Sequence, residues 1–194
     1  MSNPTKILLA SGNQHKIQEL RQVLQPLGIE LKSTLDYPGS EEVVEDKPDL
    51  EGNALKKARF WQKKAGLPAL ADDTGLEVDA LNGEPGVYSA RYAGENATYR
   101  DNVDKLLYEL TNAENRNARF RTVIAFVTDK EEHIFEGVCE GVITKVAKGS
   151  KGFGYDPIFK PAGYEKTFAE LSSEEKNKIS HRGRALQKFI EFLR

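Results

Sequence analysis

Residues 120–127 constrain the fold more than any other stretch, because they are nearly continuously apolar and rich in β-branched side chains. A strand of this composition has to be buried on both faces. The rest of the chain must therefore supply elements that cover two sides of a sheet, which amphipathic helices do.

Strand and helix patterns alternate along the chain. Apolar runs predict strands at residues 7–10 and from 67 into an acidic stretch, and alternating apolar and polar residues predict one at 29–35. A long return strand is expected at 134–146. Apolar residues at helical spacing predict helices after Asn13, over 54–65 and after Thr98, and one helix from Ser172 or Ser173 to the end of the chain. Residues 36–49 are expected to form an acidic loop.

Composition narrows the class of protein. The 194 residues fit a single domain, 1–194, and the net charge of −2 provides no field for a nucleic-acid polymer. Cys139 is the single cysteine, which fits a reducing compartment and predicts a cytoplasmic protein. No apolar run reaches membrane-spanning length, so no membrane partner is expected.

The acidic stretch begins with Asp72 and Asp73 at the expected end of a strand. Adjacent side chains of an extended backbone face opposite sides, so one carboxylate can enter a site while the other braces it. Gly75 permits a turn or a close backbone approach. Paired carboxylates suit a hard cation such as Mg²⁺, and the alternative is a strand end with solvated acids.

Residues 11–16, Ser-Gly-Asn-Gln-His-Lys, connect a strand to a helix. Backbone N–H groups at a helix start attract anions, and Lys16 adds a positive charge. The loop therefore suits a phosphate group, although an ordinary strand-to-helix turn with a solvated lysine has the same composition.

A second loop, residues 148–157, mixes glycine, lysine and aromatic residues. Aromatic rings on a flexible backbone suit stacking on a planar base. The alternative is that Phe153 and Tyr155 fill the core. Several cations, Lys176, His181 and Arg182 among them, lie early in the last predicted helix, where they oppose the helix dipole and indicate an anionic partner.

Four motifs in this order resemble the inosine triphosphatase (Ham1-like) family of nucleoside triphosphate pyrophosphatases. They are residues 11–16, 71–76, 152–157 and 180–183, reading SGNQHK, ADDTGL, GFGYDP and SHRG. Asn53-Ala54 with Lys57, and residues 88–92 (YSARY), add to the likeness. Gly52 and Thr74 depart from it, because many relatives carry Glu and Ser there.

The resemblance implies a mixed α/β fold: a strongly twisted central sheet with flanking helices, and two lobes around an active-site cleft. It implies a magnesium-dependent homodimer that converts ITP, dITP or XTP to the monophosphate and pyrophosphate. Such an enzyme serves nucleotide metabolism by keeping these nucleotides out of DNA and RNA.

The resemblance also implies a role for each matching residue. Asp73 would be the proton acceptor and, with Glu45, a magnesium ligand, and Asp72 would be a supporting acid. The substrate would be bound by Ser11, Gly12, Asn13, Gln14, His15, Lys16, Lys57, Thr74, Phe153, Gly154, Tyr155, Asp156, Lys176, His181 and Arg182. Within this set, Phe153 would stack on the base, while His181 and Arg182 would contact base and phosphate.

Two other functions fit parts of the pattern. A haloacid-dehalogenase-like phosphatase also has a strand ending in aspartates, but its two acids usually lie one residue apart, whereas Asp72 and Asp73 are adjacent. A nucleotide-binding module without catalysis would use the same loops. Release of pyrophosphate, release of orthophosphate, or no turnover distinguishes the three.

Overall fold

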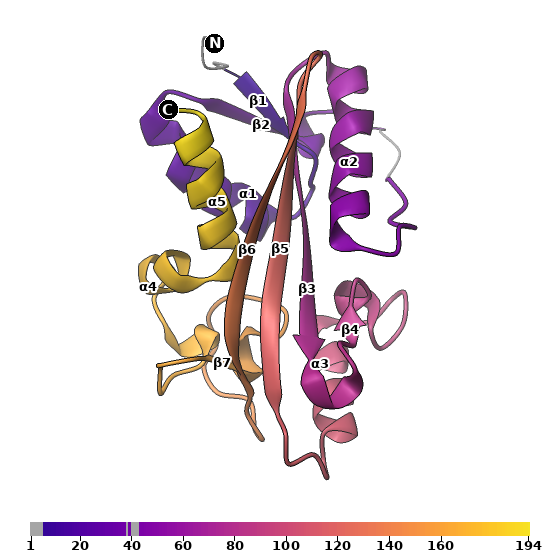
Figure 1. Ribbon diagram of the computed structural model, residues 1–194, viewed down its shortest axis with the longest axis vertical. Coiled ribbons are helices and arrows are strands. Elements are labelled where there is room, and N and C mark those ends of the chain that lie inside the picture. Colours follow the sequence, from indigo (N-terminus) through magenta and orange to yellow (C-terminus); the bar gives the residue numbers. More distant parts are fainter. Residues whose placement is uncertain (1–5, 38, 40–42) are drawn as a thin grey trace. The chain divides into compact units, whose positions relative to one another are not determined.

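The structure, a computed structural model, describes residues 6–37, 39 and 43–194 (Figure 1). They form two compact units. The first comprises the described part of Met1–Asp73 with Val123–Phe135 and Lys188–Arg194, and the second comprises Thr74–Thr122 and Glu136–Gln187.

One sheet with the strand order β2-β1-β3-β5-β6-β7 runs through the chain, and β4 pairs with β3. The strands are β1 (Lys6–Leu9), β2 (Glu30–Ser33), β3 (Ala69–Val78), β4 (Pro85–Gly86), β5 (Asn117–Val127), β6 (Glu132–Ile143) and β7 (Phe159–Pro161). The helices are α1 (Gln14–Leu24), α2 (Leu50–Ala65), α3 (Tyr99–Glu109), α4 (Ser173–Ile179) and α5 (His181–Phe192). Figure 1 shows β3, β5 and β6 as the long strands of the sheet.

In the first unit, β1 pairs in parallel with both β2 and β3. Asn13 caps α1 as predicted, because its side chain accepts the backbone N–H groups of His15 and Lys16. Helix α2 buries Ala54, Ala58 and Trp61, so small side chains let it pack closely, also as predicted.

In the second unit, β4 and β7 pair antiparallel with their neighbours, which makes the sheet mixed. Thr98 caps α3 through a capping box with Asp101. Gly75 serves a close approach rather than a turn, because a Cβ there would lie 2.7 Å from the carbonyl oxygen of Gly86. The strand β3 can therefore receive β4 directly against its backbone.

Two expectations about element ends were wrong. The strand β3 does not stop at Asp72 and Asp73 but continues to Val78. The C-terminal segment is two helices, because Ser180 has an extended backbone (φ −71°, ψ 156°) that ends α4 before α5 begins. His181 and Arg182 therefore open a helix of their own instead of lying inside a longer one.

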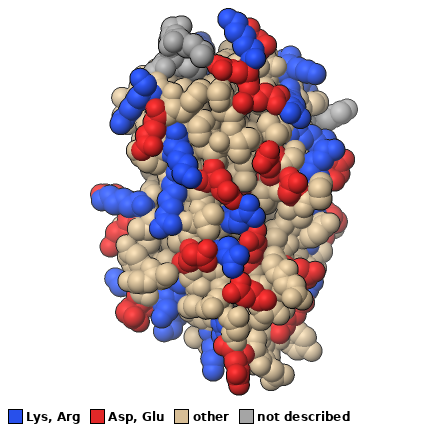
Figure 2. All heavy atoms as spheres, viewed as in Figure 1, with Lys and Arg blue, Asp and Glu red and all other residues tan. Residues whose placement is uncertain are grey.

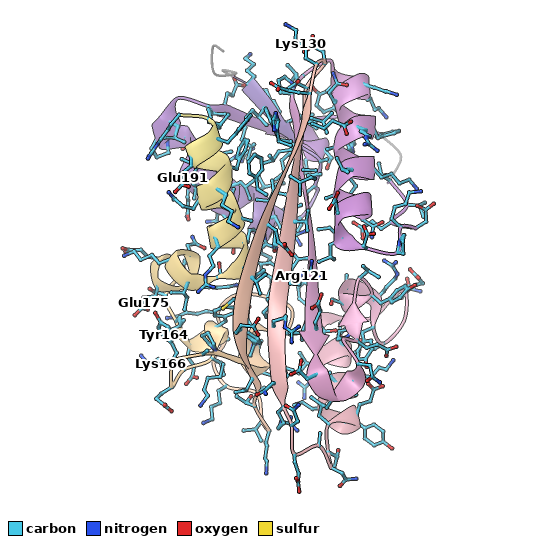
Figure 3. All side chains as sticks on the ribbon, viewed as in Figure 1. Arg121, Lys130, Tyr164, Lys166, Glu175 and Glu191 are labelled. Atoms are coloured by element: carbon cyan, nitrogen blue, oxygen red, sulfur yellow. The ribbon has the colours of Figure 1, made fainter. Side chains whose placement is uncertain are left out.

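Side chains of both signs lie along β3, β5 and β6 in the second unit. Arg121 of β5, labelled in Figure 3, donates to Glu77 at 2.7 Å and to Glu136 at 2.6 Å. Acidic and basic groups alternate on the face in Figure 2, in keeping with the small net charge. Within the described ranges, no helix has the length and apolar character needed to cross a membrane.

Candidate functional site

In the first unit, the ammonium group of Lys57 contacts three acidic residues. It donates hydrogen bonds to the carboxylate of Glu45 and, at 2.8 Å, to the backbone oxygen of Asp72, and it lies 3.5 Å from Asp73 Oδ1. Glu45 comes from the predicted acidic loop, of which residues 38 and 40–42 lie outside the described residues. Lys57 belongs to α2 and the aspartates belong to β3, so a helix and a mostly buried strand hold the group.

Lys16 of α1 contacts Asp72, with 3.1 Å between its Nζ and Oδ2. The two neighbouring aspartates thus meet lysines from different helices, as opposite-facing side chains of a strand can. Asp72 is 2% exposed and Asp73 is 6% exposed, which excludes the alternative of a solvated strand end. We refer to Lys16, Glu45, Lys57, Asp72 and Asp73 as the lysine–carboxylate cluster.

Burial and charge shift the acid–base properties of this cluster. Burial raises the pKa of Asp73 above its ordinary value, and the acids Glu45 and Asp72 add to the rise that Lys57 and Lys16 partly oppose. Burial lowers the pKa of Lys57, but Asp73, Glu45 and Asp72 together raise it more, so the ammonium group stays charged. Asp73 is thus a carboxylate with increased proton affinity, as a general base requires.

The cluster also fits a magnesium ion. Oδ2 of Asp73 is buried and has no hydrogen-bond partner among the described residues. The described residues contain no group of three or more His, Cys, Asp or Glu side chains that could hold a metal. Protein sites for Mg²⁺ commonly use one or two carboxylates and complete the octahedron with water and substrate phosphates, so two carboxylates such as Asp73 and Glu45 would be enough for such a site.

The predicted phosphate loop has the geometry of a helix start. The hydroxyl of Ser11 accepts the N–H of Asn13 at 3.1 Å, and Asn13 caps α1. Gly12, Gln14 and His15 are exposed, while the backbone N–H groups of His15 and Lys16 are bound by the Asn13 cap. The loop and Lys16 together offer the positive end of a helix and a charged ammonium group, which attract anions.

We expect Lys16→Ala to weaken the binding of inorganic tripolyphosphate about tenfold to a hundredfold, the range of a lost charged hydrogen bond. Isothermal calorimetry measures this directly. Lys6→Ala is the matched control, because Lys6 also pairs with an acid, Glu30, but on an exposed surface. Equal affinity of the Lys16→Ala variant and the unmodified protein would contradict a phosphate-binding role for this lysine.

In the second unit, two buried cations lie against the half-buried ring of Phe153. The Nζ of Lys176 is 5.1 Å from the ring centroid, and the guanidinium carbon of Arg182 is 5.5 Å from it. Arg182 also donates a long hydrogen bond, 3.4 Å, to the hydroxyl of Thr74. We refer to Phe153, Lys176 and Arg182 as the aromatic–cation cluster.

The carboxylate of Asp156 binds two members of this cluster, Phe153 and Lys176. One oxygen of its carboxylate accepts the backbone N–H of Phe153 at 2.8 Å and the ammonium group of Lys176 at 2.6 Å. A Cβ at Gly152 would collide with the same oxygen, so only glycine allows the loop to close over it. The Asp156 carboxylate thus fixes both the loop and a lysine of α4.

Tyr155 and His181 are more deeply placed than Phe153. The ring of Tyr155 belongs to the core of its unit, and its hydroxyl donates to the backbone oxygen of Ser89 at 2.9 Å. The His181 ring stacks on Phe120 with 4.5 Å between centroids. Core filling is therefore correct for Tyr155 and incorrect for Phe153, so the loop combines both alternatives.

Sequence reasoning missed Thr122. It is fully buried on β5, and its hydroxyl shares a 2.7 Å hydrogen bond with that of Thr74. Thr74 is thereby held between Thr122 and Arg182. A single hydroxyl in an otherwise apolar part of the strand was the available signal.

Comparison with known proteins gives consistent results. The profile of the Ham1 family matches residues 7–192. A dITP/XTP pyrophosphatase of Flavobacterium johnsoniae is 50% identical over 188 residues, which covers 97% of each chain.

Solved structures agree with the sequence match. A Ham1 protein from Coxiella burnetii superimposes with a TM-score of 0.90 at 42% identity, covering 97% of this chain and 98% of its own. The Staphylococcus aureus Ham1 protein gives 0.88 at 41% identity, with 97% of each chain covered. The expected mixed sheet with flanking helices is thus confirmed.

Proposed function

Because the chain belongs to the Ham1 family, we propose that it hydrolyses ITP, dITP and XTP to the monophosphate and pyrophosphate; its Flavobacterium relative is named a dITP/XTP pyrophosphatase. The observation that carries the proposal is the lysine–carboxylate cluster. It combines a carboxylate of raised pKa with two cations, Lys16 and Lys57, on the motifs that define the resemblance. This nucleotide chemistry would remove such purines from the pool available for DNA and RNA.

The residues divide the work by chemistry. Lys16, Lys57 and the loop before α1 would bind the triphosphate, and Asp73 would accept the proton of the attacking water. Thr74, the next residue, has its hydroxyl held by Thr122 and Arg182 and would contact the substrate. The aromatic–cation cluster would receive the base, with stacking on Phe153 and donors from Arg182.

Magnesium would be held by Asp73 and Glu45. When bound, the ion would neutralise phosphate charge and polarise the bond that breaks. Lys57 contacts both carboxylates, so its single positive charge offsets part of their combined negative charge.

We further propose a cytoplasmic homodimer. The cytoplasmic assignment is supported by the single cysteine, Cys139, which is buried and unpaired with another cysteine. The dimer is expected from the family alone, and light scattering after size exclusion tests it.

The decisive experiment is a panel of nucleoside triphosphates assayed with magnesium and with EDTA. We expect pyrophosphate release from ITP, dITP and XTP, much slower reaction with ATP, and no turnover in EDTA. Orthophosphate as the first product would favour a phosphatase, and nucleotide binding without turnover would favour a binding module. Turnover that persists in EDTA would contradict the magnesium role.

Base selection separates two residues of the aromatic–cation cluster. We expect Phe153→Ala to weaken the binding of ITP and of ATP by the same factor. Stacking on an aromatic ring accepts any base and contributes roughly 1–3 kcal/mol to binding. We expect Arg182→Ala to lower the ratio of kcat/KM for ITP over ATP, because donors facing a 6-oxo group discriminate against a 6-amino group.

Steady-state kinetics on both substrates, with melting temperatures as a check on folding, measures the two effects. Arg184→Ala is a control on the same helix, since the Arg184 side chain is more exposed and donates to the backbone oxygen of Val138. A collapse of the ratio in Phe153→Ala but not in Arg182→Ala would reverse the assigned roles.

A further inference from the structure

Ser89 belongs to the YSARY motif, for which neither the sequence nor the lysine–carboxylate cluster provides a role. It is 7% exposed and makes three hydrogen bonds. Its hydroxyl accepts the backbone N–H of Leu76 at 2.9 Å and donates to the backbone oxygen of Gly86 at 2.6 Å. Its own backbone oxygen accepts the hydroxyl of Tyr155 at 2.9 Å.

These bonds join two segments that carry proposed substrate contacts. Leu76 lies two residues after Thr74 on β3, and Tyr155 lies two residues after Phe153. All five residues belong to the second unit. Ser89 is therefore a single residue through which the strand that carries Thr74 meets the loop that carries Phe153.

The loop needs such an attachment. Gly152 and Gly154 flank Phe153 and both have positive φ, 74° and 62°, a region that restrains glycine little. The Tyr155 ring is the nearest buried side chain after Phe153, and its hydroxyl ends on Ser89. A buried hydroxyl that loses its partner costs more than an exposed one, so this bond holds the ring in one position.

A second connection runs on the other side of the loop. Arg182 contacts the Phe153 ring and also donates to Thr74. Phe153 is thus linked to β3 twice: through Arg182 to Thr74, and through Tyr155 and Ser89 to Leu76. These two connections to β3 add to the direct hydrogen bond that the backbone N–H of Phe153 donates to Asp156.

We propose that Ser89 is a positioning residue for the base: through Tyr155 it sets the placement of Phe153 without touching the nucleotide. The inference rests on the proposed function, in which Phe153 stacks on the purine. It predicts that disturbing Ser89 or Tyr155 weakens recognition of the base and leaves recognition of the triphosphate intact.

The test compares two ligands by calorimetry in EDTA, where no turnover is expected. ITP reports base and phosphates together, and inorganic tripolyphosphate reports phosphates alone. For Tyr155→Phe and for Ser89→Ala we expect ITP to bind about threefold to tenfold more weakly, as for one lost hydrogen bond, with tripolyphosphate affinity unchanged. The double variant should bind ITP about as weakly as the single variant with the lower ITP affinity, because both substitutions break the same connection.

Tyr108→Phe is the matched control, since Tyr108 is 81% exposed on α3 and should affect neither ligand. Equal weakening of both ligands, or a lower melting temperature with unchanged ITP affinity, would overturn the inference by showing a purely structural role. Tyr155→Phe removes one oxygen atom and decides the matter if Ser89→Ala does not fold.

The outcomes also separate this inference from the proposed function. Unmodified protein that binds ITP but releases no pyrophosphate would refute the proposed hydrolysis while the binding comparison still tests Ser89. Unmodified protein that binds ITP no better than tripolyphosphate would overturn the positioning role together with base recognition.

Discussion

Asp73→Asn is expected to lower kcat for ITP by about 100- to 10,000-fold, the usual cost of removing a general base, and further if a magnesium contact is lost. The amide has the shape of the carboxylate but cannot accept the proton of water. Pyrophosphate release under saturating ITP measures the loss. Asp46→Asn is the control, because Asp46 is an exposed acid of the same unit, paired with Lys56.

The same variant should not lose stability at pH 7. Burial raises the pKa of Asp73 in the folded protein, so the fold binds this proton more tightly than the unfolded chain does. The stability linked to that proton is fully present below the ordinary pKa of 3.8 and is lost as pH rises through the folded value. Ionisation of Asp73 costs stability above the folded pKa, and asparagine never ionises, so the asparagine variant should melt at the same or a higher temperature. Near-normal turnover in such a folded variant would remove Asp73 from the mechanism.

Asp156→Ala should be the most destabilising substitution of the aromatic–cation cluster and its supports. It leaves the Lys176 ammonium group buried without its carboxylate, which typically costs about 3–5 kcal/mol. In a chain of this size that corresponds to a fall in melting temperature of roughly 6–20 °C. The N–H of Phe153 loses its acceptor at the same time.

A matched pair on the same helix provides the control. Lys178 and Glu174 of α4 also form an ion pair, at 2.7 Å, but their side chains are 70% and 80% exposed. Glu174→Ala should therefore cost less than about 1 kcal/mol. Thermal unfolding of both variants decides the point: similar melting temperatures would show that the Asp156–Lys176 pair contributes no more than a surface contact.

The parts of the fold that could be predicted are those with local causes. Asn13 and Thr98 begin helices because their side chains cap nearby N–H groups, and that chemistry is visible in a few consecutive residues. The small face of α2 was equally visible, since Ala54 and Ala58 recur at helical spacing. For the candidate site, Lys16, Asp72 and Asp73 stand in the predicted motifs, and the structure brings them together, while their roles remain predictions.

The failures have tertiary causes. Two consecutive aspartates are typical of a solvated strand end. Here Lys16 and Lys57, from two helices, pair with the buried aspartates, so β3 can continue past them. The break at Ser180 was hidden by a continuous helical pattern of apolar residues. Its one local signal was Ser180 itself, whose hydroxyl accepts the N–H of Gly183 as a cap does. Phe153 is half-buried and Tyr155 is buried, and nothing in the sequence of their shared loop distinguishes the two.

The break at Ser180 has a consequence for how Arg182 meets a ligand. A Cβ at Gly183 would collide with the backbone oxygen of Asn177, and one at Gly137 would collide with that of His181, so β6 and α4 both contact the first turn of α5 backbone to backbone. A first helical turn usually frays, but this one is clamped on two sides. Arg182 is therefore presented from a rigid base, and the conformational entropy of its backbone is lost during folding rather than during binding. If Arg182 recognises the purine as proposed, binding would require little further ordering of the protein.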